Sequence, residues 1–306
     1  MSLASTMYPL AVSAIRIVEV GPRDGLQNEP TPIPTEAKAA FVRALAAAGL
    51  AEIEATSFVS PKWVPQLGDA QALLAELGPM PGLSALVPNV KGLERALETT
   101  IERIAVFTAA SDAFTLQNIA MDVEASLAAF AEVIGGFRAA RPDGWVRGYV
   151  STAFECPYAG RIAPDYVAKV CDRLLDLGVD EISLGDTIGV AVPAEVRSLA
   201  SSLTHIPKAK VAWHFHDTRG TAIANVAAAL ELGYTVFDAS AGGLGGCPYA
   251  PGAGGNLATE DLVYFLERSG LATGVDLGAL ARASLPVLDR LGRKPAAKAQ
   301  LAALAG

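Results

Sequence analysis

The feature that most constrains the fold is an alternation of short β-branched runs with longer amphipathic stretches along the chain. Eight candidate strands occur, and eight amphipathic stretches lie between and after them. The strands are expected at residues 15–20, 51–58, 83–87, 103–109, 146–152, 181–187, 211–216 and 235–240. Strands that alternate with helices predict parallel pairing, because each crossover helix returns the chain to the same end of the sheet.

Eight such units favour a closed barrel over an open, doubly wound sheet. No G-x-G-x-x-G follows the first strand, as a dinucleotide-binding sheet would show. Helical stretches at 34–49, 163–178 and 221–233 each end in glycine, the residue best suited to the left-handed stop after a helix. We therefore predict an α/β chain folded as a single (β/α)8 TIM barrel. One domain is expected over 1–306, with a barrel core at about 15–270 and a C-terminal helical extension at 271–306.

Composition and charge restrict the class of partner. A net charge of −8 gives no overall attraction for nucleic acid or an anionic membrane, so we expect a small-molecule partner. Three scattered cysteines without a C-x-x-C pair exclude a disulfide framework and indicate a reducing compartment. The sequence shows neither a signal-peptide pattern nor an apolar run of roughly 18 to 20 residues. Together these features predict a cytoplasmic protein.

Reactive side chains are expected after the strands, because the loops that leave the C-terminal ends of barrel strands converge on one mouth. The first strand is followed by "VGPRDGLQNEP", which places Arg23 beside Asp24. Pro22, Asp24 and Gly25 would also form an ordinary tight turn. At the end of a strand, however, the pair offers a carboxylate for a cation and a guanidinium for a developing oxyanion.

Two histidines lie at the end of the seventh predicted strand. His214 and His216 stand two residues apart in "WHFHD", so they point to one face of the strand. This arrangement indicates a metal site as readily as a structural role. Asp217 is a candidate for the partner that orients one imidazole. The remaining histidine, His205, is expected on the surface.

Two further acidic positions allow both a functional and a structural interpretation. Glu52 and Glu54 share one face of the second strand, and Glu54 is expected nearer the mouth, as a catalytic or a structural carboxylate. Asp186 follows the sixth strand in "LGDT", where it would serve either the site or the cap of the next helix.

The last strand leads into "GGLGGCPYAPGAGGN", a glycine-rich loop that contains Cys247 and ends at Asn256. A buried filler cysteine in a flexible crossing segment is the alternative to a functional thiol. Asp24, His214, His216 and Asn256 supply two oxygen and two nitrogen ligands without a thiolate. Such a set suits a six-coordinate Mg²⁺ or Mn²⁺ better than a structural Zn²⁺, and it leaves Cys247 free.

Five segments in this order resemble the signatures of the 3-hydroxy-3-methylglutaryl-CoA lyase family of metal-dependent TIM-barrel enzymes. They are "VGPRDGLQNEP", "EATSFVSPKWVPQ", "GDTIGV", "HFHDT" and "GGLGGCPYAPGAGGNLATEDLVY", and the resemblance covers about residues 15–270. It implies cleavage of an acyl-CoA substrate, 3-hydroxy-3-methylglutaryl-CoA, to acetyl-CoA and acetoacetate by a homodimer with a divalent cation. The implied cation ligands are Asp24, His214, His216 and Asn256.

The resemblance also implies roles for further side chains. Arg23 would stabilise the thioester enolate, Cys247 would help protonate it, and Glu54 and Gln27 would line the site. Asp24 and His214 both remain candidates for the base that removes the hydroxyl proton.

Two departures from the family pattern leave the acyl group open. Arg219 stands where a tyrosine is expected and Pro30 where a lysine is common, so a related 3-hydroxy-3-alkylglutaryl-CoA is an alternative substrate. The sequence also leaves open an acetyl-CoA-dependent synthase of the same superfamily and a catalytically inactive binding protein.

Overall fold

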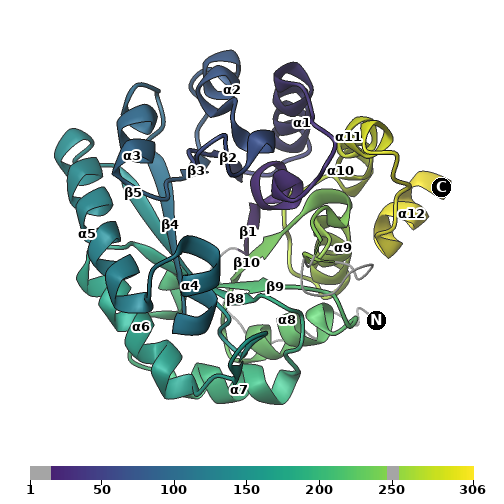
Figure 1. Ribbon diagram of the computed structural model, residues 1–306. Coiled ribbons are helices and arrows are strands. Elements are labelled where there is room, and N and C mark those ends of the chain that lie inside the picture. Colours follow the sequence, from purple (N-terminus) through teal and green to yellow (C-terminus); the bar gives the residue numbers. More distant parts are fainter. Residues whose placement is uncertain (1–14, 247–254) are drawn as a thin grey trace.

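Eight parallel strands close into a barrel in the computed structural model, which describes residues 15–246 and 255–306. The hydrogen-bonded order around the barrel is β1-β10-β9-β8-β5-β4-β3-β2, so the expected (β/α)8 barrel is confirmed (Figure 1). The eight strands lie within about one residue of the predicted positions. They are β1 (Arg16–Glu19), β2 (Glu52–Ser57), β3 (Leu83–Leu86), β4 (Arg103–Ala109), β5 (Trp145–Ser151), β8 (Glu181–Asp186), β9 (Val211–Phe215) and β10 (Val236–Ala239).

Helices surround the barrel on its outer side (Figure 1). The expected glycine stops are confirmed, since Gly49, Gly178 and Gly233 have φ angles of 105°, 90° and 86° at the ends of their helices. The surrounding helices are α1 (Thr35–Ala47), α2 (Ala70–Leu77), α3 (Val90–Leu97), α4 (Asp112–Ile119), α5 (Val123–Ala140), α6 (Pro164–Asp176), α7 (Pro193–Ser202), α8 (Ala222–Glu231) and α9 (Thr259–Arg268).

Alternation along the strands separates an apolar outer layer from a barrel interior that holds buried polar groups beside two small apolar clusters. In β5, Val146 and Val150 belong to the main apolar core between strands and helices. The intervening Arg147 and Tyr149 are also buried, and their hydrogen bonds run to side chains of other strands. Burial of a guanidinium is costly unless its charge is paired. The interior of this barrel therefore holds an ionic network, which positions the candidate site.

Three further helices, which form a C-terminal extension, pack beside α1 and α9 (Figure 1). The Asp276 amide donates a hydrogen bond of 2.8 Å to the carbonyl of Ala48, and Gln300 Nε2 donates one of 2.9 Å to the carbonyl of Ala281. The first contact ties the extension to the end of α1, and the second holds two helices of the extension together. The helices are α10 (Leu277–Ala283), α11 (Leu285–Arg290) and α12 (Lys298–Ala305).

A small hairpin after β5 was not expected from the sequence. It pairs β6 (Glu155–Cys156) with β7 (Gly160–Arg161). Strands of two residues are too short to show a periodic pattern. Among the described residues, no helix has the length and apolar character needed to cross a bilayer.

Candidate metal centre and active site

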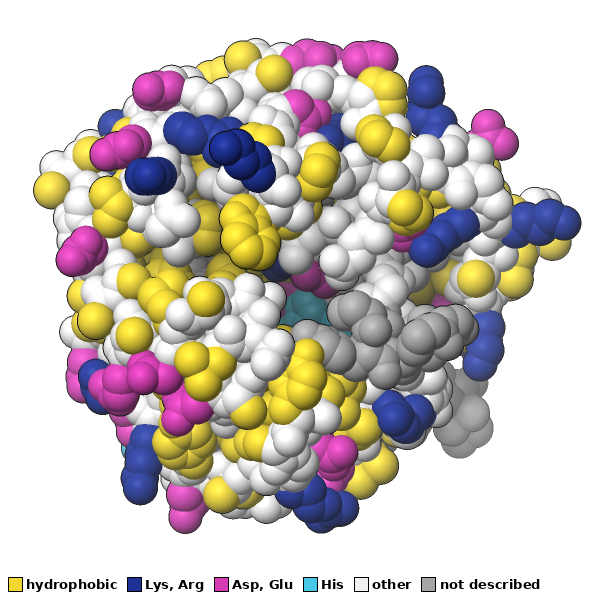
Figure 2. Space-filling model, in the orientation of Figure 1, with side chains coloured by type: hydrophobic (Ala, Val, Ile, Leu, Met, Phe, Trp, Pro, Cys, Tyr) yellow, Lys and Arg dark blue, Asp and Glu magenta, His cyan; other side chains and the backbone are white. Residues whose placement is uncertain are grey.

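The candidate site lies at the C-terminal ends of the strands, where Figure 2 shows histidine and acidic side chains at the base of a central hollow. Directly after β1, the chain forms a single turn of π-helix, η1 (Gly21–Gly25). The amides of Arg23, Asp24 and Gly25 all donate to the carbonyl of Val20, at 3.2, 2.7 and 3.1 Å. This tight turn holds Arg23 and Asp24 side by side at the mouth, and Arg23 Nη1 lies 2.6 Å from Asp24 Oδ1.

Three of the predicted ligands converge. Atoms of Asp24, His214 and His216 that are suited to metal coordination lie within 4.8 Å of one another. The two Nε2 atoms of the histidines are 3.2 Å apart, and His214 Nε2 is 3.9 Å from Asp24 Oδ2. Two nitrogen ligands at about 2.1 Å from one ion lie roughly 3 Å apart. The spacing of the imidazoles is therefore that of two ligands on a shared cation.

Asn256 adds an amide to this group. Its Nδ2 donates to Asp24 Oδ2 at 2.8 Å and to the carbonyl of Leu244 at 3.2 Å. Its Oδ1 is buried and has no hydrogen-bond partner among the residues that the structure describes. A buried amide oxygen without a partner is costly, and a hard divalent cation would satisfy it. Asp24, His214 and His216 thus fit a divalent cation by their spacing, and Asn256 fits it by its unpartnered amide oxygen.

Electrostatics in the cluster favours a neutral His216 and an ionised Asp24, the forms in which these side chains bind a cation. Burial and the neighbouring His214 lower the pKa of His216 to about 4, so this imidazole is neutral at pH 7. Burial alone would raise the pKa of Asp24, but Arg23 and the two histidines bring it well below its usual range. For His214, burial lowers the pKa, whereas the hydrogen bond and charge of Asp238 raise it above the ordinary value.

Arg23 is held by a second carboxylate. Its Nε donates to Glu54 Oε1, and the hydroxyl of Tyr149 donates to Glu54 Oε2 at 3.1 Å. The Arg23 guanidinium also lies over the Tyr149 ring, at 5.4 Å from the ring centroid. Glu54 therefore faces the site, whereas Glu52 lies near the other end of β2 and pairs there with Arg16 and Arg103. These contacts fix the positive charge of Arg23 beside Asp24 of the metal cluster.

The partner of His214 is Asp238, and the suggestion that Asp217 orients an imidazole is wrong. Asp238 Oδ2 lies 3.1 Å from His214 Nδ1. Asp217 instead accepts from the Ala222 amide at 3.0 Å and so begins α8. Consecutive residues of a strand point to opposite faces, so the residue next to His216 turns away from the interior. Asp238 was detectable as a lone carboxylate within the apolar run of β10.

Four predicted positions remain, and the structure describes three of them. Gln27 is half-buried just after η1, and Cys247 lies outside the described residues. Asp186 is buried and accepts from the amides of Val190 and Ala191, both at 3.0 Å, which gives it the structural role of stabilising a turn. His205 is exposed, as expected, with Nε2 2.7 Å from Asp172 Oδ1.

The two departures from the family pattern are both exposed. Arg219 Nη1 donates to the carbonyls of Ile188 and Gly189, at 2.7 and 3.1 Å, and so ties the loop after β9 to the loop after β8. Pro30 lies on the loop between η1 and α1.

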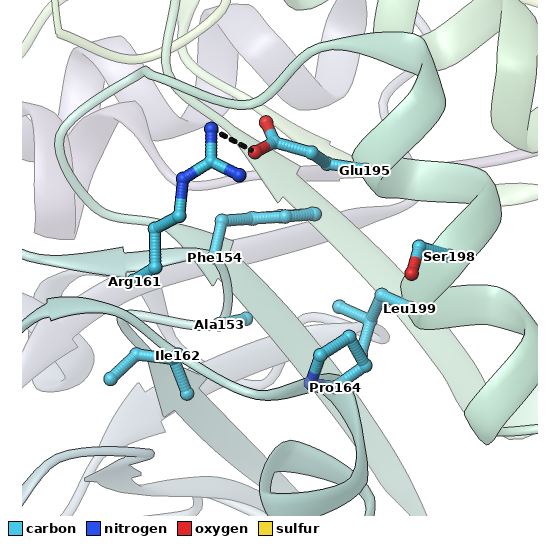
Figure 3. A pocket seen from close by; sticks show the side chains of 8 residues that line it. All are labelled: Ala153, Phe154, Arg161, Ile162, Pro164, Glu195, Ser198 and Leu199. Carbon is cyan, nitrogen blue, oxygen red and sulfur yellow. Dashed lines mark ion pairs between the residues drawn. The ribbon is translucent and has the colours of Figure 1, made fainter.

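A pocket of about 140 Å³ lies between the β6–β7 hairpin and α7 (Figure 3). Arg161 and Glu195 form an ion pair of 3.5 Å across it, and Phe154 and Leu199 line its apolar wall. No member of the metal cluster lines this pocket, so the chemistry is assigned to the barrel mouth.

Comparison with known proteins agrees with this geometry. Residues 14–287 match the family model described as HMGL-like. The chain is 48% identical over 294 residues to the hydroxymethylglutaryl-CoA lyase of Pseudomonas mevalonii, which covers 95% of this chain and 97% of that protein.

Solved structures give the same result. The hydroxymethylglutaryl-CoA lyase of Pseudomonas aeruginosa aligns with a TM-score of 0.92 and 46% identity, over 96% of this chain and 98% of that one. An HMG-CoA lyase from Acinetobacter baumannii, in complex with coenzyme A and 3-methylmalate, aligns with a TM-score of 0.87 and 38% identity, over 93% of both chains.

Proposed function

The chain belongs to the HMGL-like family, and on that premise we propose that it is a hydroxymethylglutaryl-CoA lyase. The reaction is a retro-Claisen-type cleavage of 3-hydroxy-3-methylglutaryl-CoA to acetyl-CoA and acetoacetate. The observation that carries the proposal is the convergence of Asp24, His214, His216 and Asn256 beside the guanidinium of Arg23. This arrangement combines cation ligands with an oxyanion-stabilising group at one barrel mouth.

The chemistry requires one proton removal and one proton delivery. A base takes the proton of the tertiary hydroxyl at C3, and the electron pair of that O–H bond forms the ketone. The C2–C3 bond then breaks, and its electrons move to C2 as the enolate of the thioester. Protonation at C2 completes acetyl-CoA and leaves acetoacetate, so that atoms and charge balance.

Each step has a candidate residue at the mouth. A divalent cation bound by the four ligand residues would hold the substrate oxygens and lower the pKa of the hydroxyl. Asp24 and His214 both remain candidates for the base, since each lies within the cluster. We assign stabilisation of the thioester enolate to Arg23. Glu54 orients this guanidinium by accepting a hydrogen bond from its Nε. Gln27 is proposed as a substrate-binding residue from its place just after the η1 turn.

Delivery of the proton at C2 is proposed for Cys247. The support is the family resemblance and the position of the glycine-rich segment between η4 (Ala241–Gly243) and Asn256, two elements that adjoin the site. The Gly245 backbone closely approaches Asn256, since a Cβ at this glycine would lie 2.7 Å from Nδ2. The two ends of the segment are thus anchored at the mouth.

A direct assay tests the proposal. Purified protein is incubated with 3-hydroxy-3-methylglutaryl-CoA and Mg²⁺ or Mn²⁺, and acetoacetate and acetyl-CoA are measured. Formation of both products in equal amounts supports the lyase. No product, together with condensation of acetyl-CoA with a 2-oxo acid, would instead identify a synthase. Faster cleavage of a longer 3-hydroxy-3-alkylglutaryl-CoA would transfer the assignment to that substrate.

We also propose the finer assignments that accompany this activity. Mg²⁺ or Mn²⁺ is the cation, because the ligand set is oxygen and imidazole without thiolate. The protein is proposed to act in the cytoplasm, in leucine degradation, where loss of the gene would slow growth on leucine.

A homodimer is proposed from the family and from Leu301 and Leu304, which α12 exposes, and analytical ultracentrifugation tests it.

The whole chain is proposed to form one lyase domain. The support is that the main apolar core contains Leu280 and Leu288 of the C-terminal extension together with Phe41 and Leu45 of α1. A chain truncated at residue 270 would expose this part of α1, and we expect it to unfold at a lower temperature.

A further inference from the structure

Asp238 stands at the centre of a buried group that the proposed reaction does not use. The residue is on β10, and strand register places it directly beside His214 on β9. It is 1% exposed. Neighbouring strands of the barrel supply two more members, Ser183 on β8 and Arg147 on β5. Four strands that are adjacent in the barrel therefore each contribute one side chain to this group.

Both oxygens of the Asp238 carboxylate accept hydrogen bonds. Arg147 Nη2 donates to Oδ1 at 2.6 Å, and Ser183 Oγ donates to Oδ2 at 2.7 Å. The guanidinium is always charged and has no acceptor, so Oδ1 must remain an acceptor. His214 Nδ1 lies 3.1 Å from Oδ2. A carboxylate held in this way offers no proton to the imidazole, and the hydrogen of this contact therefore sits on Nδ1.

The position of that hydrogen determines whether the other ring nitrogen, Nε2, can bind a cation. With the hydrogen on Nδ1, Nε2 of the neutral ring carries a lone pair. Nε2 is the atom that faces His216 at 3.2 Å and Asp24 at 3.9 Å. A metal ligand needs this lone pair, and the hydrogen bond on the opposite nitrogen commonly fixes it.

The second histidine is held differently. His216 Nδ1 is buried and has no hydrogen-bond partner among the residues described by the structure. Its backbone instead forms a β-bridge with Asn256. Among the described residues, a side-chain carboxylate therefore orients His214 but not His216.

We propose that Asp238, held by Arg147 and Ser183, is a positioning residue that fixes the tautomer and orientation of His214 for cation binding. The inference rests on the proposed metal-dependent function and deepens it. Arg147 extends the arrangement, because its Nη1 donates to the Tyr149 hydroxyl at 3.3 Å and Tyr149 donates in turn to Glu54. The group that orients the ligand His214 is thus linked to the group that orients Arg23.

Substitution of Asp238 by Asn is expected to move the ring hydrogen of His214 from Nδ1 to Nε2. Arg147 requires an acceptor, so the amide oxygen must occupy the place of Oδ1 and the NH2 group the place of Oδ2. That NH2 group donates to His214 Nδ1 and transfers the ring hydrogen to Nε2, where it blocks the cation. An Asn in place of a histidine-bound Asp is known to impose the wrong tautomer. Asp238→Ala removes the orienting group but leaves the tautomer free.

The test is Mn²⁺ affinity, measured by titration calorimetry on folded protein without substrate. We expect Asp238→Asn to weaken binding by roughly 10- to 100-fold, at least as much as Asp238→Ala. Asp186→Asn is the matched control, since both oxygens of this buried carboxylate accept from backbone amides and it is not a member of the metal cluster; it should change affinity less than twofold. A purely structural role predicts the opposite order, because Asn is isosteric and Ala leaves a cavity. An Asp238→Asn protein with wild-type affinity would overturn the inference.

A second readout needs no variant. The chain contains only three histidines, so ¹⁵N-histidine labelling gives a simple spectrum. In Mg²⁺-saturated wild type, we expect the His214 hydrogen on Nδ1, and a hydrogen on Nε2 would refute the proposal even if the variants failed to fold. If the wild type does not bind Mn²⁺, the proposed metal-dependent function fails. If the wild type binds and Asp238→Asn binds equally well, only the role of Asp238 fails.

Discussion

Glu19, the last residue of β1, is fully buried and joins the two loops that flank the candidate site. Its Oε1 accepts from the amides of Gly21 and Ala241, at 2.7 and 2.9 Å, and its Oε2 accepts from Thr259 Oγ1 at 2.6 Å. Burial nevertheless dominates, and it raises the pKa of this carboxyl from 4.5 to about 7. We predict that replacing Glu19 by Gln makes stability less dependent on pH.

The size of the effect follows from the shift in pKa. Between pH 4.5 and 7 the folded protein keeps the Glu19 proton and the unfolded chain does not. Stability from this group is therefore complete below the unfolded value and declines as pH rises toward the folded value. At about 1.36 kcal/mol per pKa unit, the wild type should lose roughly 2.5 kcal/mol relative to Glu19→Gln between pH 5 and pH 8. Gln preserves the acceptor for both amides and a polar partner for Thr259.

Urea unfolding in EDTA, followed by tryptophan fluorescence, measures the free energy of unfolding across this pH range. The two proteins should be about equally stable at pH 5, and the variant should be the more stable at pH 8. Glu36→Gln, which removes an exposed carboxylate from α1, is the control and should follow the wild type. Parallel curves for wild type and Glu19→Gln, or a variant that is the less stable at pH 8, would refute the reasoning.

Three further predictions concern the reaction. Cys247→Ala should lower kcat by at least about 100-fold and leave Mn²⁺ affinity within twofold, because the thiol is proposed as a proton donor and not as a ligand; loss of Mn²⁺ binding would contradict this. Arg23→Gln should lower kcat/KM by roughly 100- to 1,000-fold, since it removes the enolate-stabilising charge, whereas unchanged kinetics would exclude that role. Chelation with EDTA should abolish acetoacetate formation and added Mn²⁺ should restore it; full activity in EDTA would rule out the cation.

Much of the fold was predictable because local and global signals agree. Short apolar runs mark the barrel strands, and seven of the eight strands contain β-branched residues, β3 being the exception. Gly49, Gly178 and Gly233 end their helices with positive φ, as the sequence predicted. The β6–β7 hairpin was missed because each of its strands contributes only two residues. A periodic signal needs more residues than that.

The candidate site was also predictable only in part. Arg23, Asp24, His214 and His216 follow strand ends, and the barrel topology alone brings such residues to one mouth. The sequence offers Asp217 and not Asp238 as a candidate partner of an imidazole, because distance along the chain does not measure distance inside a closed sheet. The true partner of His214 is 24 residues away in sequence yet adjacent in register, and only strand order and register reveal that relation.

The ion pairs of the barrel interior form two levels, which are joined where Arg147 Nε lies 3.1 Å from Glu181 Oε1. At the end where β1 and β2 begin, Arg16 and Arg103 face Glu52 and Glu181, so two positive charges meet two negative ones. At the mouth, three described carboxylates face two guanidiniums; these are Asp24, Glu54 and Asp238 against Arg23 and Arg147.

With both imidazoles neutral, as cation binding requires, these five ion-paired groups carry one negative charge in excess, and buried charge of that kind is unfavourable without a counter-ion. A divalent cation reverses the excess to one positive charge. The free carboxylate of a 3-hydroxy-3-methylglutaryl group then restores neutrality. The cation and the anionic substrate each correct the imbalance that the other leaves, which is a physical reason for one barrel mouth to require both.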